Sequence, residues 1–342
     1  MNVATPPEKL AAKDYASDQE VRWCPGCGDY AILRAMTKTL AEMGAKRENT
    51  VFVSGIGCAA RFPYYISSYG FHTIHGRSPA IATGVKLSNP ALDVWVIGGD
   101  GDMLSIGGNH TMHALRRNVD LQILLFNNAI YGLTKGQYSP TSRPGTRSPS
   151  TPMGSLDNPL SPTQFALGAG ARFVARSVDT LQQHLPVVLK RAYEHKGASF
   201  VEIFQNCIVY NDGVFDRFTA KENAAENQLH LEHGKPMIFG QARGKGIRVK
   251  PGTLSLEVVS LGEGGVAEAD LLVHDESNRT VAFMLAQMEP PDFPVALGVL
   301  YCNPAPAYEA LVAGQIEEAK RRQPQADLNA LLRRGTTWRL GA

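Results

Sequence analysis

Hydrophobic and polar positions alternate in blocks along this chain, and the clearest block lies between residues 93 and 132. An apolar run ending at Ile97 leads into the sequence GGDGD, an amphipathic stretch follows, and a second apolar run over residues 121–126 ends in two asparagines. Continuous apolar runs of this length are typical of buried strands, and apolar positions three and four residues apart are typical of helices. The pattern therefore predicts strand, turn, helix, strand and turn, with the two strands parallel and joined by one crossover.

Blocks of the same kind precede and follow this unit. The sequence predicts helices that begin after Cys27, at Ser78 and near Asp179, and a stop at Gly44. Further strands are expected over residues 50–57, over a short stretch from 71 and over 199–206. Helices are expected over residues 29–42, from 78 onward and over 179–195. Residues 134–163 are expected to form a loop. We therefore predict an α/β fold with a doubly wound, mostly parallel sheet. The expected organisation is an N-terminal arm over residues 1–20, a main domain over 21–210 and a C-terminal extension over 211–342.

The two polar turns lie at the carboxyl ends of neighbouring strands, which is where an open parallel sheet binds its ligand. Asp100 offers a carboxylate oxygen and Asn128 an amide oxygen, the hard donors that Mg²⁺ prefers. Gly99 and Gly101 flank Asp100 and let the backbone approach a bulky anion closely. This combination suits an octahedral Mg²⁺ that holds a diphosphate. A strand-to-helix turn capped by an aspartate would also place Asp100 at this point.

Composition narrows the class of protein. The 342 residues are 44% hydrophobic, with 34 basic and 32 acidic side chains and a net charge of +2. This balance gives no reason to expect a nucleic acid or a membrane surface as partner. No apolar run reaches the roughly 18 residues of a spanning helix. The first 20 residues are polar and carry acids, unlike a signal or transit peptide, so we expect a cytoplasmic protein with a loose leading arm.

Two of the five cysteines form a CxxC pair, Cys24 and Cys27, immediately before an expected helix. Disulfides are not expected in a protein without an export signal, so the pair indicates a metal or redox role. Thioredoxin-like exchange, a zinc site and an iron–sulfur site all use such a pair. Cys58 and Cys207 each follow an expected strand and so lie at the carboxyl edge of the sheet, where four thiolates could converge. Cys302 is expected to be a small core residue.

These motifs together resemble the β subunits of the 2-oxoacid:ferredoxin oxidoreductases. The residues that carry the resemblance are WCPGCGDY, SGIGC, GDG followed after 25 residues by NN, IYGLTKGQYSPT and FQNC, in the family's order and spacing. The resemblance covers roughly residues 15–240. It implies a sheet of the thiamine-diphosphate-binding, or pyrophosphate-domain, type.

The resemblance also implies the ligands of each cofactor. Mg²⁺ would be held by Asp100, Asn128 and the main-chain oxygen of Ile130, and a 4Fe–4S cluster by Cys24, Cys27, Cys58 and Cys207. The residues expected around thiamine diphosphate are Ile56, Gly57, Cys58, Ala59, His75, Gly99, Gly101, Asp102, Asn128, Gly132 and Leu133. Arg61, His75 and Lys135 are the expected catalytic residues.

The implied reaction is the CoA-dependent oxidative decarboxylation of a 2-oxoacid, with electrons passed through the cluster to ferredoxin. Arg61 and Lys135 favour 2-oxoglutarate, giving succinyl-CoA and CO₂, because a dicarboxylic acid needs a cation for its far carboxylate. CoA phosphates explain Lys135 equally well. The activating glutamate for thiamine is expected from a partner α subunit, in an (αβ)₂ assembly.

Other interpretations explain fewer of these motifs. Pyruvate or another 2-oxoacid could be the substrate, and the enzyme could run in the carboxylating direction. A non-redox thiamine diphosphate decarboxylase or synthase would leave four cysteines unused. A zinc-stabilised binding module would leave Asp100 and Asn128 unused, and a thioredoxin-like protein would use only Cys24 and Cys27.

Overall fold

The computed structural model describes residues 10–323, 327–338 and 340–341. Its strands are β1 (Thr50–Ser54), β2 (Tyr69–His72), β3 (Asp93–Gly99), β4 (Gln122–Asn127), β5 (Phe173–Val178), β6 (Ser199–Phe204), β7 (Gln228–His230), β8 (Ile238–Phe239), β9 (Lys245–Val249), β10 (Leu256–Ser260) and β11 (Val295–Cys302). Its α-helices are α1 (Asp29–Met43), α2 (Ser78–Ser88), α3 (Asp100–Leu104), α4 (Gly108–Arg117), α5 (Pro162–Gly168), α6 (His184–Glu194), α7 (Asp216–Thr219), α8 (Lys221–Asn227), α9 (Arg279–Ala286), α10 (Tyr308–Arg322) and α11 (Leu328–Leu332).

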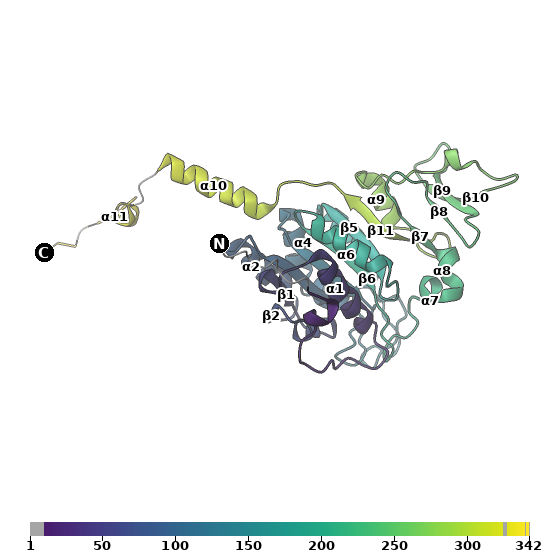
Figure 1. Cartoon of the computed structure of the whole chain (residues 1–342), viewed down its shortest axis with the longest axis horizontal. Coiled ribbons are helices and arrows are strands. Elements are labelled where there is room, and N and C mark those ends of the chain that lie inside the picture. The colour runs from purple at the N-terminus through teal and green to yellow at the C-terminus, as the bar shows by residue number, and fades with distance from the viewer. Residues whose placement is uncertain (1–9, 324–326, 339, 342) are drawn as a thin grey trace, which may run out of the picture.

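Eight strands form one central sheet in the order β2-β1-β3-β4-β6-β5-β11-β7 (Figure 1). The pairs from β2 to β5 are all parallel, the pair of β5 and β11 is antiparallel, and β7 is parallel to β11. The expected α/β fold with a mostly parallel sheet is therefore confirmed. In particular, β3 and β4 are adjacent and parallel, as the pattern around residues 93–132 predicts.

Helices cover both faces of the sheet because its central strands are apolar on both sides. On β4, Ile123 and Leu125 belong to a core that also includes residues of α2, α4, α5 and α9. Leu124 and Phe126 alternate with them and pack on the other face with residues of α1 and α6. The continuous apolar run of β4 is thus the expected signature of a strand buried from both sides.

The sheet does not stop at the expected domain boundary after residue 210. Strands β7 and β11 come from the C-terminal extension, and β11 pairs with β5 of the main domain. Between them, the chain forms a small antiparallel sheet of β8, β9 and β10. Part of residues 211–342 therefore completes the main sheet, while α10 and α11 project away from the body (Figure 1).

The leading segment is also more ordered than a loose arm in the part that the structure describes. Tyr15 is fully buried and packs in the core with residues of α1. Its hydroxyl donates hydrogen bonds to the main-chain oxygens of Leu40 and Ala45. The prediction of a loose segment is therefore wrong for residues 10–20, and residues 1–9 lie outside the described residues.

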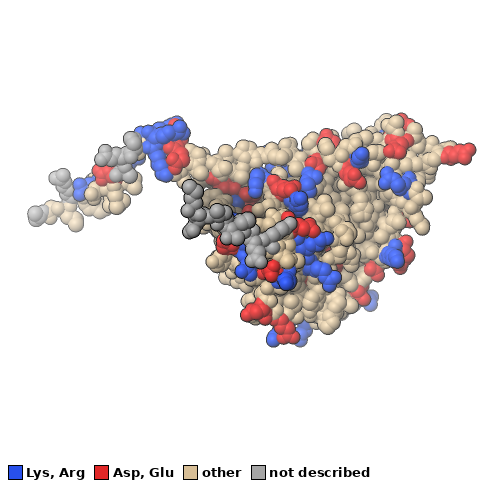
Figure 2. All heavy atoms as spheres, in the orientation of Figure 1, with Lys and Arg blue, Asp and Glu red and all other residues tan. Residues whose placement is uncertain are grey.

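Charged side chains of both signs are dispersed over the face in Figure 2, with a basic group at the end of α10. Within the described part of the chain, no helix has the length and apolar character needed to cross a membrane.

Candidate functional site

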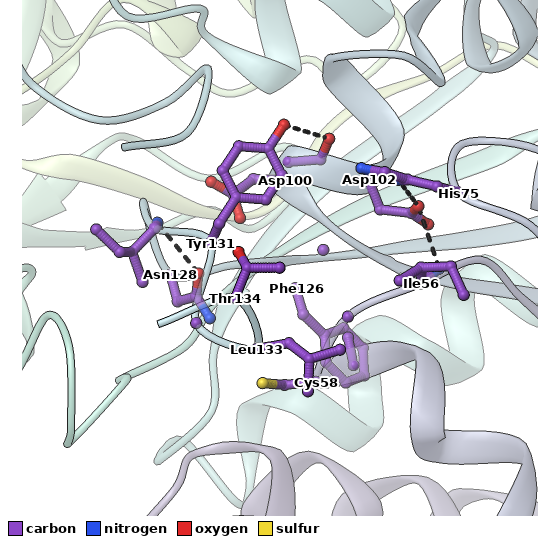
Figure 3. Close-up of a pocket in the computed structure, with 16 residues that line it drawn as sticks. Ile56, Cys58, His75, Asp100, Asp102, Phe126, Asn128, Tyr131, Leu133 and Thr134 are labelled. Atoms are coloured by element: carbon purple, nitrogen blue, oxygen red, sulfur yellow. Dashed lines mark hydrogen bonds and ion pairs between the residues drawn. The ribbon is translucent and has the colours of Figure 1, made fainter. Parts of the chain in front are cut away.

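A cavity lies at the carboxyl edge of the sheet, where β1, β3 and β4 end (Figure 3). Parallel strands bring these turns to one edge, although the turns are far apart in the sequence. The lining residues are Ile56, Gly57, Cys58, Ala59, His75, Gly99, Asp100, Gly101, Asp102, Phe126, Asn128, Ile130, Tyr131, Gly132, Leu133 and Thr134. Every residue expected around thiamine diphosphate lines this cavity, and so do the three expected Mg²⁺ ligands.

Asp100 begins α3 and is almost completely buried. Its Oδ2 accepts hydrogen bonds from the hydroxyls of Ser139, at 2.5 Å, and Thr141, at 2.6 Å. Burial raises the pKa of the Asp100 carboxyl to about 6, although these hydrogen bonds act in the opposite direction. A buried carboxylate of this kind gains from a bound cation, which offsets the cost of removing its charge from water.

Asn128 and Ile130, in the turn after β4, carry the other two oxygens expected to bind Mg²⁺. Asn128 Nδ2 donates to Gln205 Oε1 at 2.8 Å, and Asn128 Oδ1 accepts from the main-chain N–H of Ile130 at 3.2 Å. Ala129 between them has a φ of +53°. No described residue donates a hydrogen bond to the main-chain oxygen of Ile130. Carboxylate, amide and carbonyl oxygens on one wall fit Mg²⁺, the hard cation of the expected diphosphate complex.

Two glycines on this edge let the backbone pack closely against neighbouring side chains. A Cβ on Gly101 would lie 2.2 Å from the ring of Tyr131, whose hydroxyl donates to the Gly101 main-chain oxygen at 3.0 Å. A Cβ on Gly55 would lie 2.0 Å from Asp102 Oδ2. These contacts fix where the backbone approaches the cavity.

Asp102 connects the turn after β1 to the turn after β2 (Figure 3). Its Oδ1 lies 2.5 Å from His75 Nδ1 and accepts hydrogen bonds from the main-chain N–H groups of Ile56, at 3.2 Å, and Gly76, at 2.7 Å. The His75 ring is thereby held on the cavity wall, in edge-to-face contact with Tyr131. His75 is positioned to contact a ligand.

A second cavity adjoins the first, and four cysteines, Cys24, Cys27, Cys58 and Cys207, line it. Cys58 and Cys207 approach each other across Gly132, where an added Cβ would lie 3.5 Å from each sulfur. Among the described residues, no group of three His, Cys, Asp or Glu side chains is arranged to hold a single metal ion. Thiols distributed around a cavity fit a multinuclear iron–sulfur cluster, whose ligands are spaced more widely than those of one ion.

Burial raises the pKa of the Cys58 thiol to about 12, and it also raises the pKa of Cys27. The neighbouring carboxylate of Asp29 and the other thiols contribute in the same direction. Thiols in such a place stay protonated unless a metal binds and stabilises the thiolate. The two cavities share Cys58, Asn128, Gly132 and Leu133.

Comparisons with known proteins agree with this geometry. Residues 55–203 match the thiamine pyrophosphate enzyme family, C-terminal TPP binding domain. The chain is 49% identical to the 2-oxoglutarate oxidoreductase subunit KorB of Mycobacterium tuberculosis, over 98% of this chain and 90% of that protein. This chain belongs to the β subunits of the 2-oxoacid:ferredoxin oxidoreductases.

Two further relatives support the assignment of this β subunit. Subunit beta of the 2-oxoacid:ferredoxin oxidoreductase 1 of Aeropyrum pernix is 49% identical over 56% of this chain and 60% of its own length. A solved structure of the 2-oxoglutarate:ferredoxin oxidoreductase from Magnetococcus marinus, with 2-oxoglutarate, coenzyme A and succinyl-CoA bound, has a TM-score of 0.77 and 34% identity. That match covers 95% of this β subunit and 96% of the solved chain.

The structure separates the three residues expected to be catalytic in this β subunit. His75 lines the cofactor cavity, whereas Arg61 lines the cysteine cavity and donates from Nη1 to the main-chain oxygen of Arg22 at 2.9 Å. Lys135 is exposed, has a φ of +75° and lines neither cavity. Cys302 is also remote, with its sulfur 3.9 Å from His195 Nδ1.

Several residues of the site lie in sequence motifs but have no role that the sequence pattern predicts. Ser139 and Thr141, which hydrogen-bond to Asp100, come from the long loop after β4. Gln205 accepts from Asn128 and also donates to Cys27 Sγ at 3.3 Å, so it joins the two cavities. The motifs IYGLTKGQYSPT and FQNC contain these residues, but only the fold gives them a role.

Proposed function

We propose that this β subunit forms part of a 2-oxoglutarate:ferredoxin oxidoreductase, which converts 2-oxoglutarate and CoA to succinyl-CoA and CO₂ and passes electrons to ferredoxin, a reaction that also runs in the carboxylating direction. One observation carries the proposal. A cavity with three oxygen donors shares a wall with a cavity lined by four thiols. A thiamine enzyme without redox chemistry has no use for the second cavity.

Each cavity has a separate task. When bound, thiamine diphosphate supplies a carbanion that adds to the 2-oxoacid, and a 4Fe–4S cluster supplies a one-electron acceptor beside it. Asp100, Asn128 and the Ile130 carbonyl oxygen would hold Mg²⁺ and through it the diphosphate. Cys24, Cys27, Cys58 and Cys207 would hold the cluster within electron-transfer reach, since Cys58 belongs to both walls.

A partner α subunit is part of the proposal because the site is incomplete. No glutamate is among the described residues that line the cofactor cavity, so the acid that activates the thiamine ring is expected from another chain. Large apolar side chains around the two cavities are exposed, including Leu133 at 49% and Val209 at 54%. Exposed apolar surface beside a site is typical of a protein interface. The expected assembly is (αβ)₂.

The proposed location is the cytoplasm. All five cysteines are free thiols in the structure, as expected of a protein in a reducing compartment.

The first test compares the β chain alone with the αβ complex, both purified without oxygen. We expect iron, sulfide and thiamine diphosphate in the complex, with reduction of ferredoxin that requires both CoA and 2-oxoglutarate. The β chain alone should show no turnover, because it lacks the activating glutamate. Turnover by the β chain alone would remove the need for the partner, and a complex with thiamine but no iron would favour a non-redox decarboxylase.

The choice of substrate gives a second prediction. We expect Arg61→Ala to lower kcat/KM for 2-oxoglutarate by about tenfold to a hundredfold and to leave that for pyruvate nearly unchanged. A partly desolvated contact between a guanidinium and a carboxylate contributes roughly 1.5–3 kcal/mol. Arg22→Ala is the matched control, since Arg22 lines the same cavity while its guanidinium pairs with Glu20 at 3.2 Å.

The measurement is kcat/KM for 2-oxoglutarate, pyruvate and 2-oxobutyrate in each variant. If preference for 2-oxoglutarate is absent or survives Arg61→Ala, another group selects the substrate. KM for CoA in Lys135→Ala separates the two roles proposed for Lys135, because loss of a contact with CoA phosphates would raise that constant alone.

A further inference from the structure

A chain of hydrogen bonds crosses the sheet and ends at the proposed Mg²⁺ site. It begins on β5, where Arg176 Nε donates to Glu202 Oε2 on β6 at 2.8 Å. Glu202 Oε1 accepts from Asn127 Nδ2 on β4 at 2.7 Å. The single hydroxyl proton of Thr141 is shared between two acceptors, Asn127 Oδ1 at 2.9 Å and Asp100 Oδ2 at 2.6 Å.

Asn127 is the junction of this chain. Because Glu202 takes its amino group, the amide oxygen must point to the carboxyl edge, where it accepts from the hydroxyl of Thr141 and from the main-chain N–H of Ala129 at 3.2 Å. One asparagine therefore contacts both halves of the site. Thr141 forms a hydrogen bond to Asp100. The left-handed turn at Ala129 sets the positions of Asn128 and Ile130.

The ion pair at the start of the chain is deeply buried. Arg176 is 5% exposed and Glu202 is 1% exposed. A buried ion pair is weak evidence for a contribution to stability, because removing two charges from water offsets much of their attraction. Arg176 and Glu202 also line a cavity that shares no residue with the cofactor cavity. Among the described residues, the hydrogen bonds of the pair lead toward the cofactor cavity through Asn127 and then Thr141.

We propose that Arg176 and Glu202 are positioning residues for the Mg²⁺–diphosphate site, which they act on by fixing the amide orientation of Asn127. With Glu202 in place, Asn127 presents an acceptor to both Thr141 and Ala129. Without Glu202, the amide is free to rotate and present its amino group, which repels the Ala129 N–H and breaks the turn that carries two of the three oxygens. This inference rests on the proposed cofactor site.

The test uses the αβ complex with an Arg176→Met, Glu202→Leu double substitution. Apolar residues of similar volume often replace a buried ion pair without loss of stability. The readout is the Mg²⁺ concentration at which thiamine diphosphate is half retained in equilibrium dialysis, with the melting temperature measured on the same samples. Lys86→Met is the matched control, because Lys86 forms another buried ion pair, with Asp120 at 2.8 Å, that has no link to the cofactor cavity.

We expect the half-saturating Mg²⁺ concentration to rise by about tenfold or more in the double variant, as for other residues that orient metal ligands. The value of kcat at saturating Mg²⁺ and thiamine diphosphate should be close to that of the wild type, because no group that touches the substrate has changed. Lys86→Met should leave the Mg²⁺ requirement unchanged, whatever its effect on melting temperature.

A double variant with an unchanged Mg²⁺ requirement would overturn the proposal and leave the pair a purely structural role. If the double variant does not fold, Glu202→Gln decides, because its amide keeps the volume of the glutamate but has one oxygen, which the charged Arg176 takes, so that an amino group faces Asn127 Nδ2. The same rise in Mg²⁺ requirement is then expected, and its absence overturns the proposal. A wild-type complex that retains no thiamine diphosphate in the presence of Mg²⁺ would instead refute the proposed function.

Discussion

An Asp100→Asn variant of the αβ complex is expected to keep its iron and lose its thiamine diphosphate. Asp100 supplies the only carboxylate among the three oxygens proposed for Mg²⁺, and Asn removes its charge while keeping its shape. Outer-shell groups alone change metal affinity by about 10- to 100-fold, so loss of this direct ligand should weaken Mg²⁺ binding by at least about a hundredfold. Thiamine diphosphate content after gel filtration and iron content of the same sample measure the two outcomes.

The matched control for this variant is Asp157→Asn. Asp157 accepts a hydrogen bond from the hydroxyl of Tyr138 at 2.9 Å and lines neither cavity. The Asp157→Asn complex should therefore retain both thiamine diphosphate and iron. Full thiamine diphosphate content in Asp100→Asn, at wild-type Mg²⁺ concentrations, would show that the diphosphate is held in another way.

The reverse result is expected when Cys24 and Cys27 are both replaced by serine. Serine oxygen is a poor ligand for iron beside thiolates, because hard oxygen and soft sulfur ligands favour different metals. Iron should fall from about four atoms per β chain to less than about one, since these residues supply two of four cluster ligands. Transfer of electrons to ferredoxin should cease, while thiamine diphosphate should remain bound.

Cys302→Ser is the matched control for the cysteine variants. Cys302 is partly buried, and its pKa is raised by burial like that of Cys58, but it lines neither cavity. Its iron content and activity should equal those of the wild type. Full iron content in the double Cys24, Cys27 variant would defeat the assignment of these cysteines to the cluster.

The sequence predicted the structure best where local pattern and spacing determine it. The apolar runs that lead to Asp100 and to Asn128 predicted two strands, and the structure has them as adjacent parallel strands, β3 and β4. Cys58 and Cys207 follow predicted strands and line one cavity with the CxxC pair. Strand ends can be located in this way because burial on both faces requires a continuous apolar run, and parallel strands end at one edge.

Other parts of the site could not be predicted because they depend on contacts between distant segments. Ser139 and Thr141 belong to a loop with no periodic pattern, and only the folded chain brings their hydroxyls to Asp100. Arg176 and Glu202 interrupt two apolar strands and would appear unfavourable in isolation, yet they pair across neighbouring strands. Such a pairing follows from the order of strands in the sheet, which local sequence does not encode.

The sequence by itself thus determined the turns that carry the proposed ligands, while the tertiary structure decided what holds those turns in place. Strand β11, more than 100 residues after β5 in the sequence, pairs with β5, and Tyr15 anchors a segment that its polarity had suggested was loose. The hydrophobic periodicity of the sequence indicates which residues are buried, but it does not indicate which residues they pack against. That choice is made by packing and hydrogen bonding between segments far apart in the chain, and it forms only when the whole sheet assembles.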